Sequence, residues 1–145
     1  MFRIAEAVHA HVLLTGTTPT PPNRKISKTA RSTVEQVTWA YAPSPIDLLR
    51  QLKEKGSYLL AMELTDESQD VFTAPLPDEV ISGQQALVLI PGAEAGGVPA
   101  GILDLCHASV HLPMRGRNSS LNVAVALGAV AYVLDHRLST DKVSK

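Results

Sequence analysis

The stretch that most constrains the fold is residues 112–128, where an apolar run passes through a polar, glycine-containing loop into an apolar segment. A strand, a loop and a helix in this order are the parts from which α/β proteins build ligand sites. The first turn of a helix leaves backbone N–H groups unpaired, and Ser119, Ser120 and Asn122 can accept hydrogen bonds from them. The stretch therefore has two interpretations: a helix cap alone, or a site whose free amides face an anionic or carbonyl-bearing ligand.

Helical and strand-like segments alternate along the whole chain. Helices are expected at residues 2–10, 27–34, 45–55, 99–106 and 121–138, and strands at 11–15, 58–64, 86–90 and 108–112. Ser44 is the expected cap of the helix that begins with Pro45. The continuous apolar run at 86–90 is typical of a strand buried on both faces of a parallel sheet. The alternation predicts a single α/β domain over residues 1–145, with a parallel sheet flanked by helices.

The composition is that of an ordinary folded domain. The chain has 145 residues, 45% hydrophobic and 19% charged, which is enough to bury a core. Its single cysteine, Cys106, excludes an internal disulfide and suits a reducing compartment. No apolar run reaches the roughly 18 residues of a membrane span, and Glu6, His9 and His11 interrupt any signal-peptide core. We expect a cytoplasmic protein with no membrane partner.

The histidines do not predict a metal site. His9, His11, His107 and His111 lack the spacing of H-E-x-x-H or of paired Cys-x-x-Cys ligands. His107 and His111 fall at a helix end and in a strand, where a hydrogen-bonded structural histidine is the simpler interpretation. Cys106 has no base pattern near it and is expected to be a small buried hydrophobe.

Charge is unevenly distributed although the net charge is only −1. Residues 7–34 contain no acid but carry a basic segment made of Arg24, Lys25, Lys28 and Arg31, whereas residues 56–114 contain no Lys or Arg. A basic segment can neutralise the phosphates of a nucleic acid, but by itself it fits a solvated surface equally well.

The expected C-terminal helix, residues 121–138, is nearly all apolar and has almost no polar face. Such a helix must be covered on all sides. Its own sheet can cover one side, and either the rest of the domain or a second subunit can cover the other.

Three segments resemble the motifs of one enzyme family. Leu112-Pro113-Met114-Arg115-Gly116, followed by Ser120-Leu121-Asn122-Val123, closely resembles the third motif of the SpoU/TrmH branch of the SPOUT RNA methyltransferases. The segment 89–98, an apolar strand that opens into Gly-x-Glu-x-x-Gly, resembles the second motif. Residues 1–7 resemble the latter half of the first motif, and the asparagine and glycine of its first half have no counterpart.

The resemblance implies a SPOUT-like fold with a C-terminal trefoil knot and a homodimer that pairs through the helix 121–138. It also implies that a leading strand and the first half of the first motif are absent. We therefore expect an N-terminally truncated catalytic domain with little or no activity as it stands.

The chemistry that the resemblance implies is methyl transfer from S-adenosylmethionine to a ribose 2′-hydroxyl of tRNA or rRNA. The implied cofactor-binding residues are Gly92, Glu94, Gly97, Leu112, Met114 and Leu121. The implied catalytic residues are Arg3, Glu94, Ser120 and Asn122. Because a guanidinium keeps its proton, we expect Arg3 to position phosphate and activate the hydroxyl electrostatically rather than to act as a base.

With these motifs present, RNA contact becomes the better interpretation of the positive charge, and DNA is not expected. The predicted RNA-binding residues are Arg24, Lys25, Lys28, Arg31, Arg115 and Arg117. A second function stays open from the sequence: a non-catalytic RNA-binding or interaction protein on the same scaffold.

Overall fold

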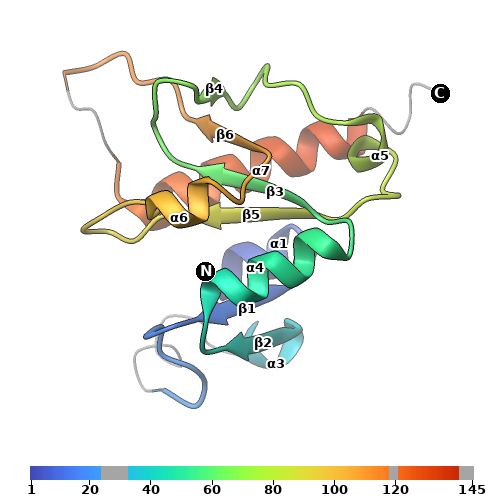
Figure 1. Cartoon of the computed structure of the whole chain (residues 1–145), viewed down its shortest axis with the longest axis vertical. Coiled ribbons are helices and arrows are strands. Elements are labelled where there is room, and N and C mark those ends of the chain that lie inside the picture. Colours follow the sequence, from blue (N-terminus) through green and yellow to red (C-terminus); the bar gives the residue numbers. More distant parts are fainter. Residues whose placement is uncertain (24–32, 118–120, 141–145) are drawn as a thin grey trace. The chain divides into compact units, whose positions relative to one another are not determined.

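The computed structural model describes residues 1–23, 33–117 and 121–140, and it divides the chain into two compact units, Met1–Leu48 and Leu49–Lys145 (Figure 1). Each unit has a parallel sheet. The basic segment at 24–31, most of the helix expected at 27–34, and Ser119 and Ser120 lie outside the described residues.

The first unit contains α1 (Phe2–Ala7), β1 (Val12–Thr15), α3 (Thr33–Gln36) and β2 (Trp39–Ala42). β1 and β2 pair in parallel, with Val12 opposite Trp39. Phe2, Val12 and Leu14 are buried in its small core. The helix predicted at 2–10 ends at Ala7, and His9 then adopts a positive φ of 52°, which a continuing helix does not allow.

The second unit carries a four-stranded sheet in the order β4-β6-β3-β5, in which every pairing is parallel. Its elements in chain order are α4 (Pro45–Glu54), which spans the boundary between the units, β3 (Tyr58–Met62), β4 (Gln69–Asp70), α5 (Asp78–Ile81), β5 (Leu87–Pro91), α6 (Ala100–Leu103), β6 (Ala108–His111) and α7 (Val123–Thr140). Ser44 caps α4 as predicted, because its Oγ accepts the N–H of Asp47 at 3.3 Å.

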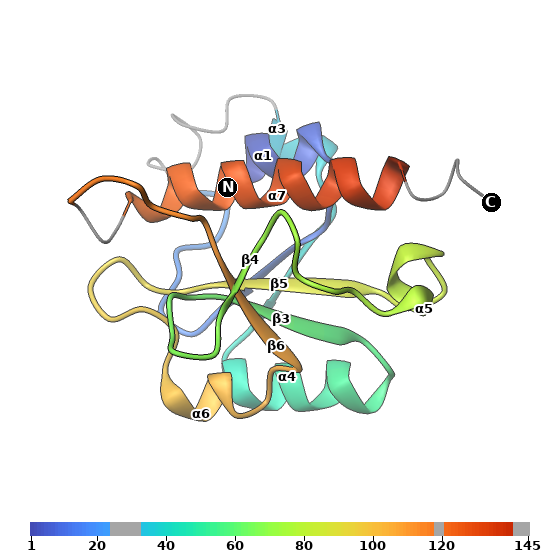
Figure 2. The same ribbon diagram turned by 90° about the horizontal axis from the view of Figure 1, so that it is seen from above.

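Helices cover both faces of this sheet, with α7 on one side and α4 and α6 on the other (Figure 2). Successive side chains of a strand point to opposite faces of the sheet, so neighbouring residues of β3 pack against different helices. Leu60 and Met62 pack in the same core as Val130 and Leu134 of α7, whereas Leu59 packs with residues of α4 and α6. The predicted α/β class, with parallel sheets flanked by helices, is confirmed.

One detail of the predicted packing is wrong. The run at 86–90 is not a strand buried on both faces: β5 pairs only with β3 in the four-stranded sheet, and all its residues are half-buried. The buried strand is β3, which lies between β5 and β6.

α7 is partly covered within the described chain, since Val130 is fully buried while Val125 is 59% exposed and Tyr132 is 54% exposed. Of the two covers expected for its other side, a second subunit stays a prediction.

In the described part of the chain, no helix combines the length and the apolar character that a membrane crossing requires. The trefoil knot stays a prediction.

Candidate functional site

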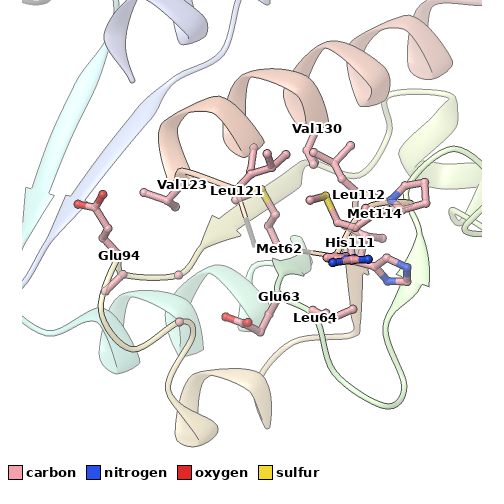
Figure 3. A pocket seen from close by; sticks show the side chains of 18 residues that line it. Met62, Glu63, Leu64, Glu94, His111, Leu112, Met114, Leu121, Val123 and Val130 are labelled. Atoms are coloured by element: carbon pink, nitrogen blue, oxygen red, sulfur yellow. The ribbon is translucent and has the colours of Figure 1, made fainter. Parts of the chain in front are cut away.

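The carboxyl ends of β3, β5 and β6 meet at one edge of the sheet, because the three strands run in parallel. The segments that follow these strands and the first turns of α7 line a cavity of about 700 Å³ (Figure 3). This is the edge at which open α/β sheets bind ligands, and the volume suits a small molecule.

The structure brings all six residues predicted to bind a cofactor to this one cavity. They are Gly92, Glu94 and Gly97 from the loop after β5, Leu112 and Met114 from the segment after β6, and Leu121 just before α7. Arg117 also lines the cavity. Arg115 lies in the same segment and is exposed, but it is not part of the lining.

The roles of two predicted catalytic residues, Ser120 and Arg3, stay predictions. Ser120 lies outside the described residues. Arg3 is exposed on α1 in the first unit, so its participation stays a prediction.

The loop after β5 is closed on itself by its own backbone. Ala93 and Gly97 exchange two hydrogen bonds, with both N···O distances 2.9 Å. Gly97 has a φ of +63°, and a Cβ on Gly92 would lie 2.5 Å from the carbonyl carbon of Gly97. Glycine is required at both positions, at the first by the close approach of the backbone and at the second by its conformation. The loop therefore presents a compact backbone surface to the cavity.

Asn122 joins the second and third motifs. Its Oδ1 accepts the N–H groups of Ala124 at 3.0 Å and Val125 at 3.3 Å, so Asn122 is the cap of α7. Its Nδ2 donates to Oε1 of Glu94 at 3.3 Å. The two interpretations of the polar stretch before α7 are thus compatible at Asn122, since one side chain caps the helix and also contacts a residue of the cavity.

Sequence reasoning missed two polar residues of the cavity, Glu63 after β3 and His111 at the end of β6. The Nδ1 atom of His111 lies 2.9 Å from Oγ of Ser68. Oγ of Ser68 also lies 2.8 Å from the carbonyl of Thr65, to which it donates; when it does so, Nδ1 of His111 can donate to Oγ and leave Nε2 to accept. The sequence offered one signal for both residues: each lies at the carboxyl end of an apolar strand, where α/β sheets bind ligands.

His107 and Cys106 have structural roles away from the cavity. Nδ1 of His107 accepts the N–H of Leu59 at 2.9 Å, and its ring stacks on Tyr58. Burial, and then the positive charge of Lys53, lower the pKa of His107. Burial raises the pKa of the Cys106 thiol, which favours its protonated form.

A parallel sheet flanked by helices, with a glycine-lined cavity at the carboxyl ends of its strands, is typical of a ligand-binding α/β protein. The chain belongs to the SpoU rRNA Methylase family, whose sequence model matches residues 1–132. The predicted resemblance to the SpoU/TrmH family is thereby confirmed.

Two curated relatives have similar sequences. The 23S rRNA (guanosine-2′-O-)-methyltransferase RlmB of Neisseria meningitidis is 28% identical over 129 residues, which are 88% of this chain and 48% of that protein. The putative TrmH family tRNA/rRNA methyltransferase YacO of Bacillus subtilis is 28% identical over 138 residues, 91% of this chain and 50% of the relative. The chain thus spans about half the length of these curated relatives.

Solved structures have the same fold. The SpoU methyltransferase AviRb from Streptomyces viridochromogenes superposes with a TM-score of 0.81 at 21% identity, over 99% of this chain and 55% of that one. An AdoMet-bound rRNA methyltransferase from Sinorhizobium meliloti superposes with a TM-score of 0.82 at 26% identity, over 94% of this chain and 50% of that one.

Proposed function

We propose that the chain is the catalytic domain of an S-adenosylmethionine-dependent RNA methyltransferase that acts on a ribose 2′-hydroxyl of tRNA or rRNA. The observation that carries the proposal is the convergence of the second and third motifs on one cavity at the carboxyl ends of parallel strands. The relatives named as 2′-O-methyltransferases support the choice of the ribose hydroxyl.

The lining of the cavity fits S-adenosylmethionine. Leu112, Met114 and Leu121 offer apolar surface to an adenine ring, while the compact backbone between Gly92 and Gly97 can approach a ribose closely. When bound, the cofactor supplies a methyl group activated by a positively charged sulfur. The AdoMet-bound structure from Sinorhizobium meliloti, 26% identical to this chain, supports this assignment.

The residues of the site act mainly by positioning. An in-line displacement requires the acceptor hydroxyl to be held close to the methyl group and its proton to be removed. Asn122 fixes the start of α7 and contacts Glu94, so the two motif loops keep a fixed separation. In the described part of the chain, three residues that line the cavity carry groups that can accept a proton: Glu63, Glu94 and His111.

Positive charge at the mouth of the cavity suits an RNA substrate. Arg117 lines the cavity and Arg115 is exposed beside it. Phosphate contacts of this kind position RNA without reading its sequence. We assign the same role to the basic segment, and we place the protein in the cytoplasm with its substrate.

A second copy of the chain is the partner that α7 fits. Val125 and Tyr132 of α7 are 59% and 54% exposed, and Leu121 just before the helix is 47% exposed, so large apolar side chains lie at the surface here. Burying them in a homodimer would remove apolar area from water. We therefore keep the expected homodimer as part of the proposal.

Calorimetry with S-adenosylhomocysteine tests the cofactor site, with ATP as the adenine-containing control ligand. Gly97→Ala and Gly56→Ala form a matched pair, because both glycines have positive φ but only Gly97 lines the cavity. We expect the wild type and Gly56→Ala to bind S-adenosylhomocysteine alike, and Gly97→Ala to bind it much more weakly. A wild-type chain that gives no heat with millimolar S-adenosylhomocysteine, or that binds ATP equally well, would contradict the proposal.

A further inference from the structure

Glu63 occupies a central place at the edge of the sheet that forms the cavity. It directly follows β3, which lies between β5 and β6 in the strand order. Its backbone N–H donates to the carbonyl of Val110 on the β6 side at 3.1 Å. Its side chain reaches the other way, and Oε2 accepts the backbone N–H of Val98, at the end of the loop after β5, at 2.7 Å. Glu63 therefore connects β6, the strand that precedes the third-motif loop, to the end of the second-motif loop.

The loop after β5 is shaped to receive this carboxylate. A Cβ on Gly97 would clash with Oε2 of Glu63, so the carboxylate reaches the backbone only because position 97 has no side chain. The next residue, Val98, is only 6% exposed and packs in the core that contains Leu59 and Ile102. A buried N–H needs a hydrogen-bond partner, and Glu63 supplies one with a charged acceptor.

The loop is therefore closed at its base and anchored at its end. The two hydrogen bonds between Ala93 and Gly97 close the loop, but neither of them reaches a neighbouring strand. The contact between Glu63 and Val98 ties the end of the loop to the end of β3. Within the described part of the chain, the other oxygen of Glu63, Oε1, makes no hydrogen bond, so one carboxylate oxygen is sufficient for the anchor.

We propose that Glu63 is a positioning residue of the cofactor site, whose carboxylate holds the Gly92–Val98 loop in the orientation that binds S-adenosylmethionine. The inference rests on the proposed function, because it assumes that this cavity binds the cofactor. Glu63 acts through the loop backbone, and what it requires is an acceptor oxygen at the right reach. A negative charge alone is not enough.

Three variants of Glu63 distinguish the effect of the length of its side chain from the effect of its charge. Glu63→Gln keeps an acceptor oxygen at the same reach, Glu63→Asp keeps the charge but is one carbon shorter, and Glu63→Ala removes both. Asp70→Ala is the matched control, since Oδ1 of Asp70 accepts the N–H of Phe72 at 2.9 Å in a similar contact outside the cavity. Each variant is assayed for the Kd of S-adenosylhomocysteine by calorimetry and for thermal unfolding.

Glu63→Ala and Glu63→Asp should each raise the Kd about tenfold, the effect of losing one hydrogen bond to a charged group. Glu63→Gln should stay within about twofold of the wild type, and Asp70→Ala should lower the unfolding temperature without changing the Kd. If Glu63→Ala does not fold, the comparison of the Gln and Asp variants decides the question.

Wild-type affinity in the Ala and Asp variants, or a Gln variant as weak as the Asp variant, would overturn the inference while leaving the proposed function intact. A wild-type chain that binds no S-adenosylhomocysteine would overturn the proposed function and this inference with it.

Discussion

Asn122 should serve two separable purposes, and substituting it tests both. In Asn122→Ala, the N–H groups of Ala124 and Val125 lose their acceptor at the start of α7. Loss of a side-chain N-cap costs about 1 kcal/mol. The bond from Asn122 to Glu94 is 3.3 Å long and exposed, so it adds at most about 0.5 kcal/mol. We expect the free energy of unfolding to fall by about 1–1.5 kcal/mol and the unfolding temperature by roughly 3–5 °C.

Asn122→Asp is the matched variant, because aspartate caps a helix as well as asparagine does but cannot donate to Glu94. Urea unfolding should give a free energy within about 0.5 kcal/mol of the wild type for Asn122→Asp. Binding of S-adenosylhomocysteine should weaken in both variants, because both lose the contact between the motif loops. Equal stability of Asn122→Ala and the wild type would refute the capping argument. Unchanged affinity in both variants would leave Asn122 a cap alone.

Three further predictions concern assembly, pH and RNA. The wild type should sediment as a dimer at micromolar concentration and Tyr132→Asp as a monomer, and a monomeric wild type would contradict the dimer. Val130 cannot be used to test the dimer, because its side chain is buried within its own unit. The pKa of His107 lies below its ordinary value of 6.5, so the unfolded chain binds the proton more tightly and stability should decrease as the pH falls below about 6.5. His107→Asn should flatten that decrease in thermal unfolding, and an unchanged pH dependence would count against it. Replacing the four basic-segment residues with glutamine should flatten the salt dependence of RNA binding, and an unchanged slope would argue for a solvated surface.

Three of the four strands of the second unit, β3, β5 and β6, were predictable because their residues form apolar runs. Residues 58–62 and 87–91 are apolar runs of strand length, and α7 begins two residues later than predicted and ends two residues later. β4 has no such run, since Gln69 and Asp70 form a strand only by pairing with β6. The same holds for β2, whose residues are half-buried or exposed and pair with a single neighbour.

The six residues predicted to bind the cofactor were grouped by motif resemblance, which carries information that periodicity does not. Glu63 was missed because its significance depends on a contact with Val98, 35 residues away in the sequence. Which side chains of α7 stay exposed could not be predicted either, because composition shows that a helix is apolar but not which of its faces its own sheet covers.

The identity of the methylated atom decides whether the chain is a ribose 2′-O-methyltransferase. The chain, in molar excess over unmodified tRNA and rRNA so that slow transfer is detected, is incubated with S-adenosylmethionine carrying a labelled methyl group. The RNA is then digested to nucleosides and analysed by mass spectrometry. We predict that the label appears as 2′-O-methylribose, whatever the base. Label on a base would contradict the proposed ribose specificity, and RNA that is retained by the chain without label would favour the non-catalytic RNA-binding protein.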